Sequence, residues 1–127
     1  MIQKIILVIL LSFTSLFSAD IVGKWQMNMP ASQKANPLEK MEESKQFVVM
    51  MFASAWNDVA FAANGTFDLP KAKQKGIWKK QGDIYIVQSS KKAPENKLTM
   101  LDDSHMKIVF DDPKIGLMTF YFLRFIK

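Results

Sequence analysis

The spacing of apolar residues predicts two kinds of element. Residues 21–29 (IVGKWQMNM) have a β-branched start and an aromatic residue and stop at Pro30, which predicts a first strand. The segment 36–39 (NPLE) has the form of a helix start, with an Asn cap, Pro at the first helical position and Glu three residues after the cap. Apolar residues then recur at helical spacing, so we expect one helix over Pro37–Ala53 that is most apolar in its second half.

From Asn57 onward, apolar and polar residues alternate, as in strands with one buried face. A three-residue turn ending on Gly65 would pair Phe61 with Phe67 and place both rings on one face. With the first strand, the chain has eight predicted strands, the later ones at 57–62, 66–69, 76–80, 84–88, 97–101, 105–111 and 116–126. Short consecutive antiparallel strands separated by turn residues predict an all-β sandwich or barrel, with one helix inserted after the first strand.

The first 19 residues have the form of an export signal, with Lys4, an apolar run ending at Phe17 and small residues before Ala19. The apolar run has 13 residues, whereas a membrane-spanning helix needs about 20. We therefore expect a signal peptide over 1–19, a single domain over 20–127 and no integral membrane segment after signal removal. The expected location is the periplasm or the medium of a bacterium. The chain has no Cys, so a hydrophobic core and hydrogen bonds must hold the exported domain without disulfides.

The chain is basic, with 17 Lys and Arg against 12 Asp and Glu, and Arg124 is its single arginine. Sequence-specific nucleic-acid contacts favour arginine, so this composition does not indicate a nucleic-acid partner. The densest group of charges, named here the lysine cluster, comprises Lys71, Lys73, Lys75, Lys79 and Lys80. Two interpretations stay open: a solvated hairpin edge protected against aggregation, or a contact with an anionic envelope surface.

Five segments in order resemble the lipocalin-like (calycin) group, most closely its short bacterial domains: IVGKWQMN, AANGTFDL, KGIWKKQGDIYIV, KLTMLDDSHMKIVF and FYFLRF. The resemblance implies an up-and-down β-barrel of about eight strands. In that group the Trp of an opening Gly-x-Trp packs against an Arg of the last strand, and Gly23, Trp25 and Arg124 occupy these barrel-closing positions. The inserted helix is similar to the lid of fatty-acid-binding proteins. However, Arg124 is followed by Phe125 and Ile126, so the Arg-x-Tyr carboxylate clamp of those proteins is not present.

A barrel of eight strands is at the size where side chains either fill it or enclose one small ligand. The candidates for lining such a ligand are Trp25, Met51, Phe52, Phe61, Phe67, Trp78, Phe120, Phe122 and Arg124. We predict an exported, non-catalytic protein that binds a small apolar or amphipathic ligand. The alternative is an envelope interaction module with a filled barrel that uses the lysine cluster or the helix face.

Other chemistry is weaker in the sequence. Met27 and Met29 could offer thioethers to Cu(I), but no third ligand follows from the spacing, and methionine as adaptable apolar filler is the preferred interpretation. His105 stands beside three polar residues in a predicted turn, which favours a capped turn over a catalytic triad. The acidic pairs 102–103 and 111–112 lack a calcium-loop register. We expect no enzymatic activity, no metal site and no cofactor.

Overall fold

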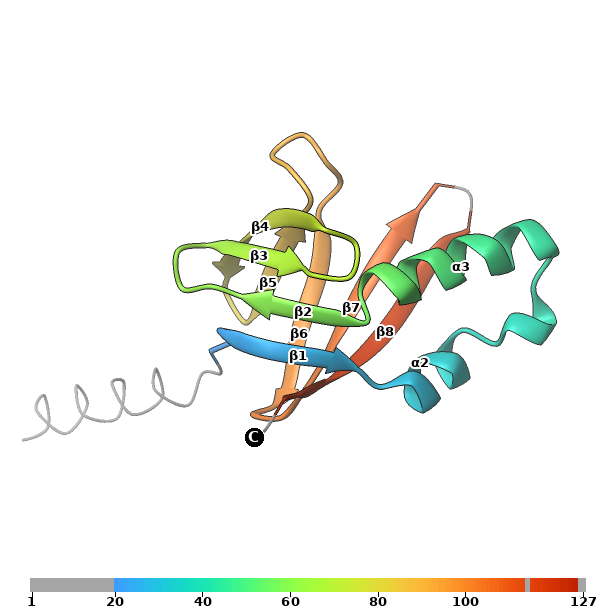
Figure 1. Cartoon of the computed structure of the whole chain (residues 1–127), viewed down its shortest axis with the longest axis horizontal. Coiled ribbons are helices and arrows are strands. Elements are labelled where there is room, and N and C mark those ends of the chain that lie inside the picture. Colours follow the sequence, from blue (N-terminus) through green and yellow to red (C-terminus); the bar gives the residue numbers. More distant parts are fainter. Residues whose placement is uncertain (1–19, 114, 126–127) are drawn as a thin grey trace, which may run out of the picture.

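The computed structural model describes residues 20–113 and 115–125, so the predicted signal peptide at 1–19 and Ile126 of the predicted last strand lie outside the described residues. Eight antiparallel strands close into an up-and-down barrel, in which β1 pairs with both β2 and β8 (Figure 1). The strands are β1 Gly23–Met27, β2 Asp58–Phe61, β3 Thr66–Leu69, β4 Gln74–Gln81, β5 Ile84–Gln88, β6 Asn96–Asp102, β7 His105–Asp112 and β8 Gly116–Arg124. The predicted fold class is confirmed, and several predicted strand ends differ by one to a few residues.

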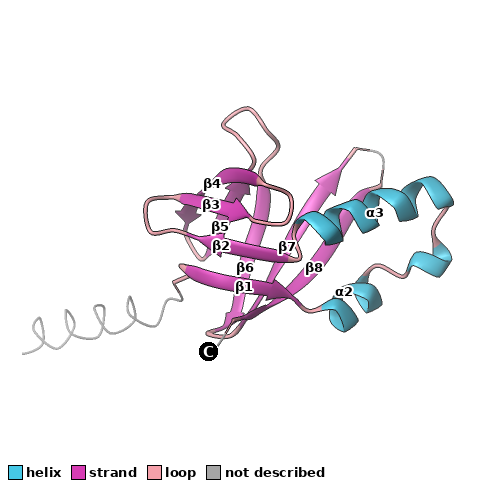
Figure 2. Ribbon diagram, viewed as in Figure 1, coloured by secondary structure: helices cyan, strands magenta, loops and turns pink. Residues whose placement is uncertain are grey.

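The connection between β1 and β2 carries the helices (Figure 2). They are α2 over Met29–Ala35, the 3₁₀ turn η1 over Leu38–Lys40 and α3 over Glu43–Ala55. The predicted single helix over Pro37–Ala53 is wrong at its start, because Pro37 and Met41 have extended backbone and interrupt the helical path. The helical region begins earlier: Asn28 caps α2 by accepting a hydrogen bond from the backbone N–H of Ala31, and a proline stands in the first turn.

The hairpin register agrees with the aromatic pattern. Phe61 lies opposite Phe67 as predicted, and their ring centroids are 5.6 Å apart. On the other side of β3, Gly76 lies opposite Phe67. A Cβ at Gly76 would overlap the Phe67 ring and would lie 2.6 Å from the carbonyl oxygen of Gln88. The missing side chain of Gly76 therefore makes the space that the Phe67 ring occupies in the core.

One end of the barrel is closed by the Gly-x-Trp segment and the last strand. Trp25 lies opposite Arg124 in the β1–β8 pairing, and the guanidinium carbon is 4.3 Å from the centroid of the Trp25 ring. Arg124 also donates hydrogen bonds of 2.7–3.0 Å to the backbone carbonyls of Asp20, Val22 and Asp103. Gly23 has φ +133°, and a Cβ there would lie 3.1 Å from Arg124 Nη1, so glycine suits both the backbone and the packing.

The other end of the barrel is covered by the end of α3. The Trp56 ring lies 5.2 Å from Phe67 and 5.1 Å from Phe110, and Phe52 lies 5.2 Å from Phe110. Figure 1 shows α3 beside β7 and β8, with α2 on the same side of the molecule. None of the helices in the described part of the chain has the length and apolar character that crossing a bilayer requires.

Candidate functional site

Most of the predicted ligand-lining residues lie in a packed barrel interior. Five of them are almost completely buried: Trp25, Phe61, Phe67, Phe120 and Phe122. All five belong to one buried hydrophobic cluster, whose ring contacts include Phe110 with Phe120 at 5.7 Å between centroids. The aromatic faces that suggested a ligand cavity inside the barrel are therefore used largely for core packing, which is strongly stabilising because aromatic side chains bury large areas.

The remaining predicted lining residues lie elsewhere. Trp78 is half-buried and donates a 2.9 Å hydrogen bond from Nε1 to the Ala62 carbonyl. Phe52 is half-buried against the core, whereas Met51 lies on the outer face of α3. Arg124 is at the closed end of the barrel, where Trp25 and three carbonyls occupy its guanidinium.

The lysine cluster lies on β4 and on the connection that precedes it. β4 pairs with β3 over Gln74–Ile77 and with β5 over Ile77–Gln81, so Lys75 pairs on the β3 side and Lys79 and Lys80 pair on the β5 side. Protection of a strand edge by these lysines stays a prediction. Lys71 pairs with Asp58 at 3.5 Å and Lys79 with Glu95 at 3.7 Å. Lys73 lies in the connection between the strands with φ 53°, while Lys75, Lys79 and Lys80 are in β4. Acidic partners thus offset part of the charge available to an anionic surface.

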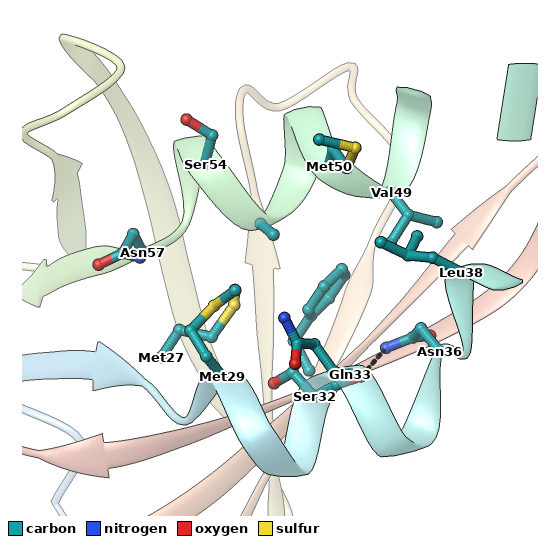
Figure 3. Close-up of a pocket in the computed structure, with 12 residues that line it drawn as sticks. Met27, Met29, Ser32, Gln33, Asn36, Leu38, Val49, Met50, Ser54 and Asn57 are labelled. Atoms are coloured by element: carbon teal, nitrogen blue, oxygen red, sulfur yellow. Dashed lines mark hydrogen bonds between the residues drawn. The ribbon is translucent and has the colours of Figure 1, made fainter. Parts of the chain in front are cut away.

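A pocket of about 360 Å³ lies between α2 and α3, outside the packed barrel interior (Figure 3). Its volume is at the small end of the range of about 300–1,000 Å³ that is typical of ligand pockets. The lining residues are Met27, Met29, Ser32, Gln33, Asn36, Leu38, Val49, Met50, Ala53, Ser54, Asn57 and Phe120. Phe120 is the one predicted lining residue among them. Because Phe120 also packs in the core, the pocket lies directly against the barrel.

Two buried polar residues, Ser32 of α2 and the C-cap residue Asn36, attach one wall of the pocket to β8. β1 pairs with β8 only at Phe122, Leu123 and Arg124, so the backbone of β8 before these residues needs other partners on that side. Asn36 donates to the Thr119 carbonyl at 2.6 Å and accepts from the Thr119 N–H at 3.3 Å.

The Ser32 hydroxyl makes the equivalent pair of hydrogen bonds with Tyr121. It accepts from the Tyr121 N–H at 2.9 Å and lies 3.3 Å from the Tyr121 carbonyl oxygen. The Tyr121 carbonyl also accepts a 2.7 Å hydrogen bond from the backbone N–H of Asn28, so the side chains of Ser32 and Asn36 take the place of a strand at the Tyr121 N–H and at both backbone groups of Thr119. Backbone N–H and C=O groups that are removed from water need such partners.

The opposite wall is one face of α3. Val49 is buried in the core cluster and Ala53 packs against it, so this face is anchored on the barrel. Met50 and Ser54 line the pocket but are exposed, which places them at its mouth. Figure 3 shows the α2 and α3 residues on opposite sides of the pocket, with the thioethers of Met27 and Met29 close together in this view.

The outer face of α3 carries an exposed apolar stripe. Phe47, Met50 and Met51 are 65%, 57% and 56% exposed, at helical positions one turn apart. Contiguous apolar side chains on a surface mark sites of interaction more often than scattered ones. Since Met50 belongs to both the stripe and the pocket lining, the two features are adjacent.

The titratable groups show local structural roles. In the turn between β6 and β7, Asp102 lies 2.7 Å from Nδ1 of His105, and this hydrogen bond lowers the pKa of the Asp102 carboxyl. Burial raises the pKa of Tyr85, with a further contribution from the negative charge of Asp20. The described residues contain no group of three or more His, Cys, Asp or Glu side chains placed to hold a metal ion.

Comparison with protein families, with curated proteins and with solved structures gives no match to this chain. The geometry of the molecule therefore carries the functional argument. The sequence does contain a signal for α2, which forms one wall of the pocket. Asn28 followed by Pro30 has the form of a helix start, as does the segment 36–39. A helix beginning after Asn28 makes Met27 and Met29 neighbours of the α3 face.

Proposed function

We propose that this protein is an exported, non-catalytic binder of a small amphipathic molecule, and that the molecule binds between α2 and α3. The observation that carries the proposal is the pocket, whose Met, Leu, Val and Phe side chains form apolar walls and whose rim is polar. Apolar walls with a few polar groups are the usual composition of small-molecule sites. The binding function agrees with the function expected from the sequence, but the proposed location is under the helices and not inside the barrel.

The closed antiparallel barrel with helices after β1 is compatible with lipocalin-like kinship. We extend the proposal to that kinship because Gly23, Trp25 and Arg124 make the barrel-closing contacts that the resemblance implies. Export rests on the form of residues 1–19. A fold of this kind accommodates unrelated ligands, so the pocket itself must define the ligand.

The flexible methionine side chains favour a site that adapts to its ligand. Met27, Met29 and Met50 all line the pocket, and thioether side chains fill irregular apolar spaces with little steric penalty. Their methyl groups also provide a direct assay. We expect a titration with 1-monolauroylglycerol, followed by NMR of ¹³C-methyl-methionine protein, to shift the signals of these three residues. The Met51 signal should shift less than these three, because Met51 lies on the same helix as Met50 but outside the lining.

A matched pair of variants on α3 tests the location. Ala53→Leu adds volume inside the pocket and should reduce the affinity at least tenfold, whereas Met51→Leu on the exposed face should leave it unchanged. Both variants should keep the far-ultraviolet circular dichroism spectrum of the parent. Equal affinity of the two variants, or shifts confined to methionines outside the pocket, would show that the amphiphile binds elsewhere.

A second candidate is an interaction module, and the exposed stripe of Phe47, Met50 and Met51 favours it. In its simplest form the partner is a second copy of the chain, paired through α3. Sedimentation equilibrium would then show a dimer that Phe47→Ser converts to monomer. A parent protein that stays monomeric at millimolar concentration would remove this candidate.

A further inference from the structure

We propose that the pocket between α2 and α3 selects uncharged amphiphiles over ionised ones of the same chain length. This inference rests on the binding function proposed above and deepens it. Its starting point is that none of the 12 lining residues carries an ionisable side chain. In the whole chain 23% of residues are charged, so the lining differs markedly from the average composition of the protein.

Lys71, which contacts the lining residue Asn57, and the single arginine are both engaged with other groups. Lys71 reaches Asn57 Oδ1 at 3.4 Å, but the same ammonium group is paired with the Asp58 carboxylate at 3.5 Å. The single arginine, Arg124, stacks on Trp25 and donates to three backbone carbonyls. A ligand carboxylate in the pocket would therefore meet no free cation among the residues that form the site.

The polar groups of the pocket divide into two sets. Ser32 and Asn36 are committed to the backbone of β8, as described above. Gln33, Ser54 and Asn57 are at or near the mouth and offer amide and hydroxyl groups, which both donate and accept hydrogen bonds. Such groups complement a hydroxyl, ester or amide headgroup.

Desolvation disfavours an ionised headgroup in this pocket. An ionised headgroup drawn towards Met27, Val49 and Phe120 loses hydration and gains no opposite charge, which is costly in an apolar environment. A neutral hydroxyl or ester loses less and can recover its hydrogen bonds from the amides and the hydroxyl at the mouth. The ligand class is thus a neutral single-chain amphiphile, of which a monoacylglycerol is an example.

The test compares three amphiphiles with the same 12-carbon chain, each kept below its critical micelle concentration. They are neutral 1-monolauroylglycerol, anionic laurate and cationic dodecyltrimethylammonium. Each is titrated into the protein, and binding is followed by the methyl signals of Met27, Met29 and Met50. We expect the neutral compound to bind at least tenfold more tightly than either ion. Laurate or the cation binding as tightly as the neutral compound would overturn the selectivity but leave the binding function intact. Failure of all three to shift these methyl signals would overturn the binding function itself.

A charge placed at the mouth provides a second, independent arm. Gln33 is exposed and lines the pocket, and its side chain makes no hydrogen bond with the described residues, so Gln33→Lys adds a cation at little structural expense. We expect this variant to gain laurate affinity at least tenfold. Ala35→Lys adds the same charge two residues away, outside the lining, and should gain less than threefold. An equal gain in both variants would indicate attraction from outside the pocket and would overturn the assignment.

Discussion

Replacement of Asn36 by alanine is expected to destabilise the protein and to loosen the α2 wall of the pocket. Asn36 is 4% exposed, and its side chain makes three hydrogen bonds, one with the Ser32 carbonyl and two with the backbone of Thr119. The alanine variant leaves the N–H and C=O of Thr119 without partners on the β1 side of β8. Each lost hydrogen bond has a net contribution of about 0.5–1.5 kcal/mol.

The three bonds together predict a loss of about 2–4 kcal/mol in the free energy of unfolding, because the part-buried carbonyls recover some hydration after the substitution. Urea unfolding followed by tryptophan fluorescence measures this loss as a shift of the midpoint. Asn36→Asp should be no better than alanine, since a carboxylate keeps the acceptor for the Thr119 N–H but cannot donate to either carbonyl.

Gln33→Ala in α2, three residues before Asn36, is the matched control for this experiment. Gln33 is exposed and its side chain makes no hydrogen bond with the described residues, so its replacement should change stability by less than about 0.5 kcal/mol. The Asn36→Ala variant should also bind 1-monolauroylglycerol more weakly than the Gln33→Ala variant. A loss below about 0.5 kcal/mol for Asn36→Ala would refute the reasoning that its side chain replaces a strand along β8.

Three further predictions test the barrel. Trp25→Ala should cost about 3–5 kcal/mol, and a double-mutant cycle with Arg124→Ala should give a coupling of at least about 0.5 kcal/mol because the two side chains stack; additive losses would contradict that contact. Gly76→Ala should cost about 1–3 kcal/mol in urea unfolding, because the new methyl group overlaps a core ring, and a neutral result would show that the ring lies elsewhere. His105→Ala should raise the pKa of Asp102 towards its ordinary value, as measured by carboxyl NMR. Because the pKa of Asp102 is lowered in the folded protein, the contact stabilises the turn at neutral pH and is lost as the pH falls through the folded-state pKa. The variant lacks the contact, so the stability of its turn should depend less on acid pH.

The barrel could be predicted from the sequence because the patterns that specify it are local. Alternating apolar residues and turn residues specify hairpins, and the three-residue turn at Gly65 specifies that Phe61 and Phe67 pair. The contact between Trp25 and Arg124 joins the two ends of the domain and followed from the family resemblance. Alternation gives the side of a strand on which a residue lies.

The pocket could not be predicted from the sequence in the same way. Alternation does not say whether inward-facing side chains fill a barrel or leave a cavity, and Phe120 shows that one residue can belong to both the core and a pocket wall. The sequence predicts Asn36 to be the N-cap of a helix, since an Asn before Pro has that form in any sequence, whereas it is the C-cap of α2. Its partner, Thr119, is distant in the chain, and the need for a partner arises only because β1 leaves β8 early.

Native mass spectrometry of the protein isolated from the cells that produce it tests the central claim most directly. We expect one copurified neutral amphiphile per chain, which 1-monolauroylglycerol displaces and which Ala53→Leu excludes from the site between α2 and α3. A protein that is consistently isolated without a ligand, or that carries an ionised lipid unaffected by Ala53→Leu, would contradict that claim.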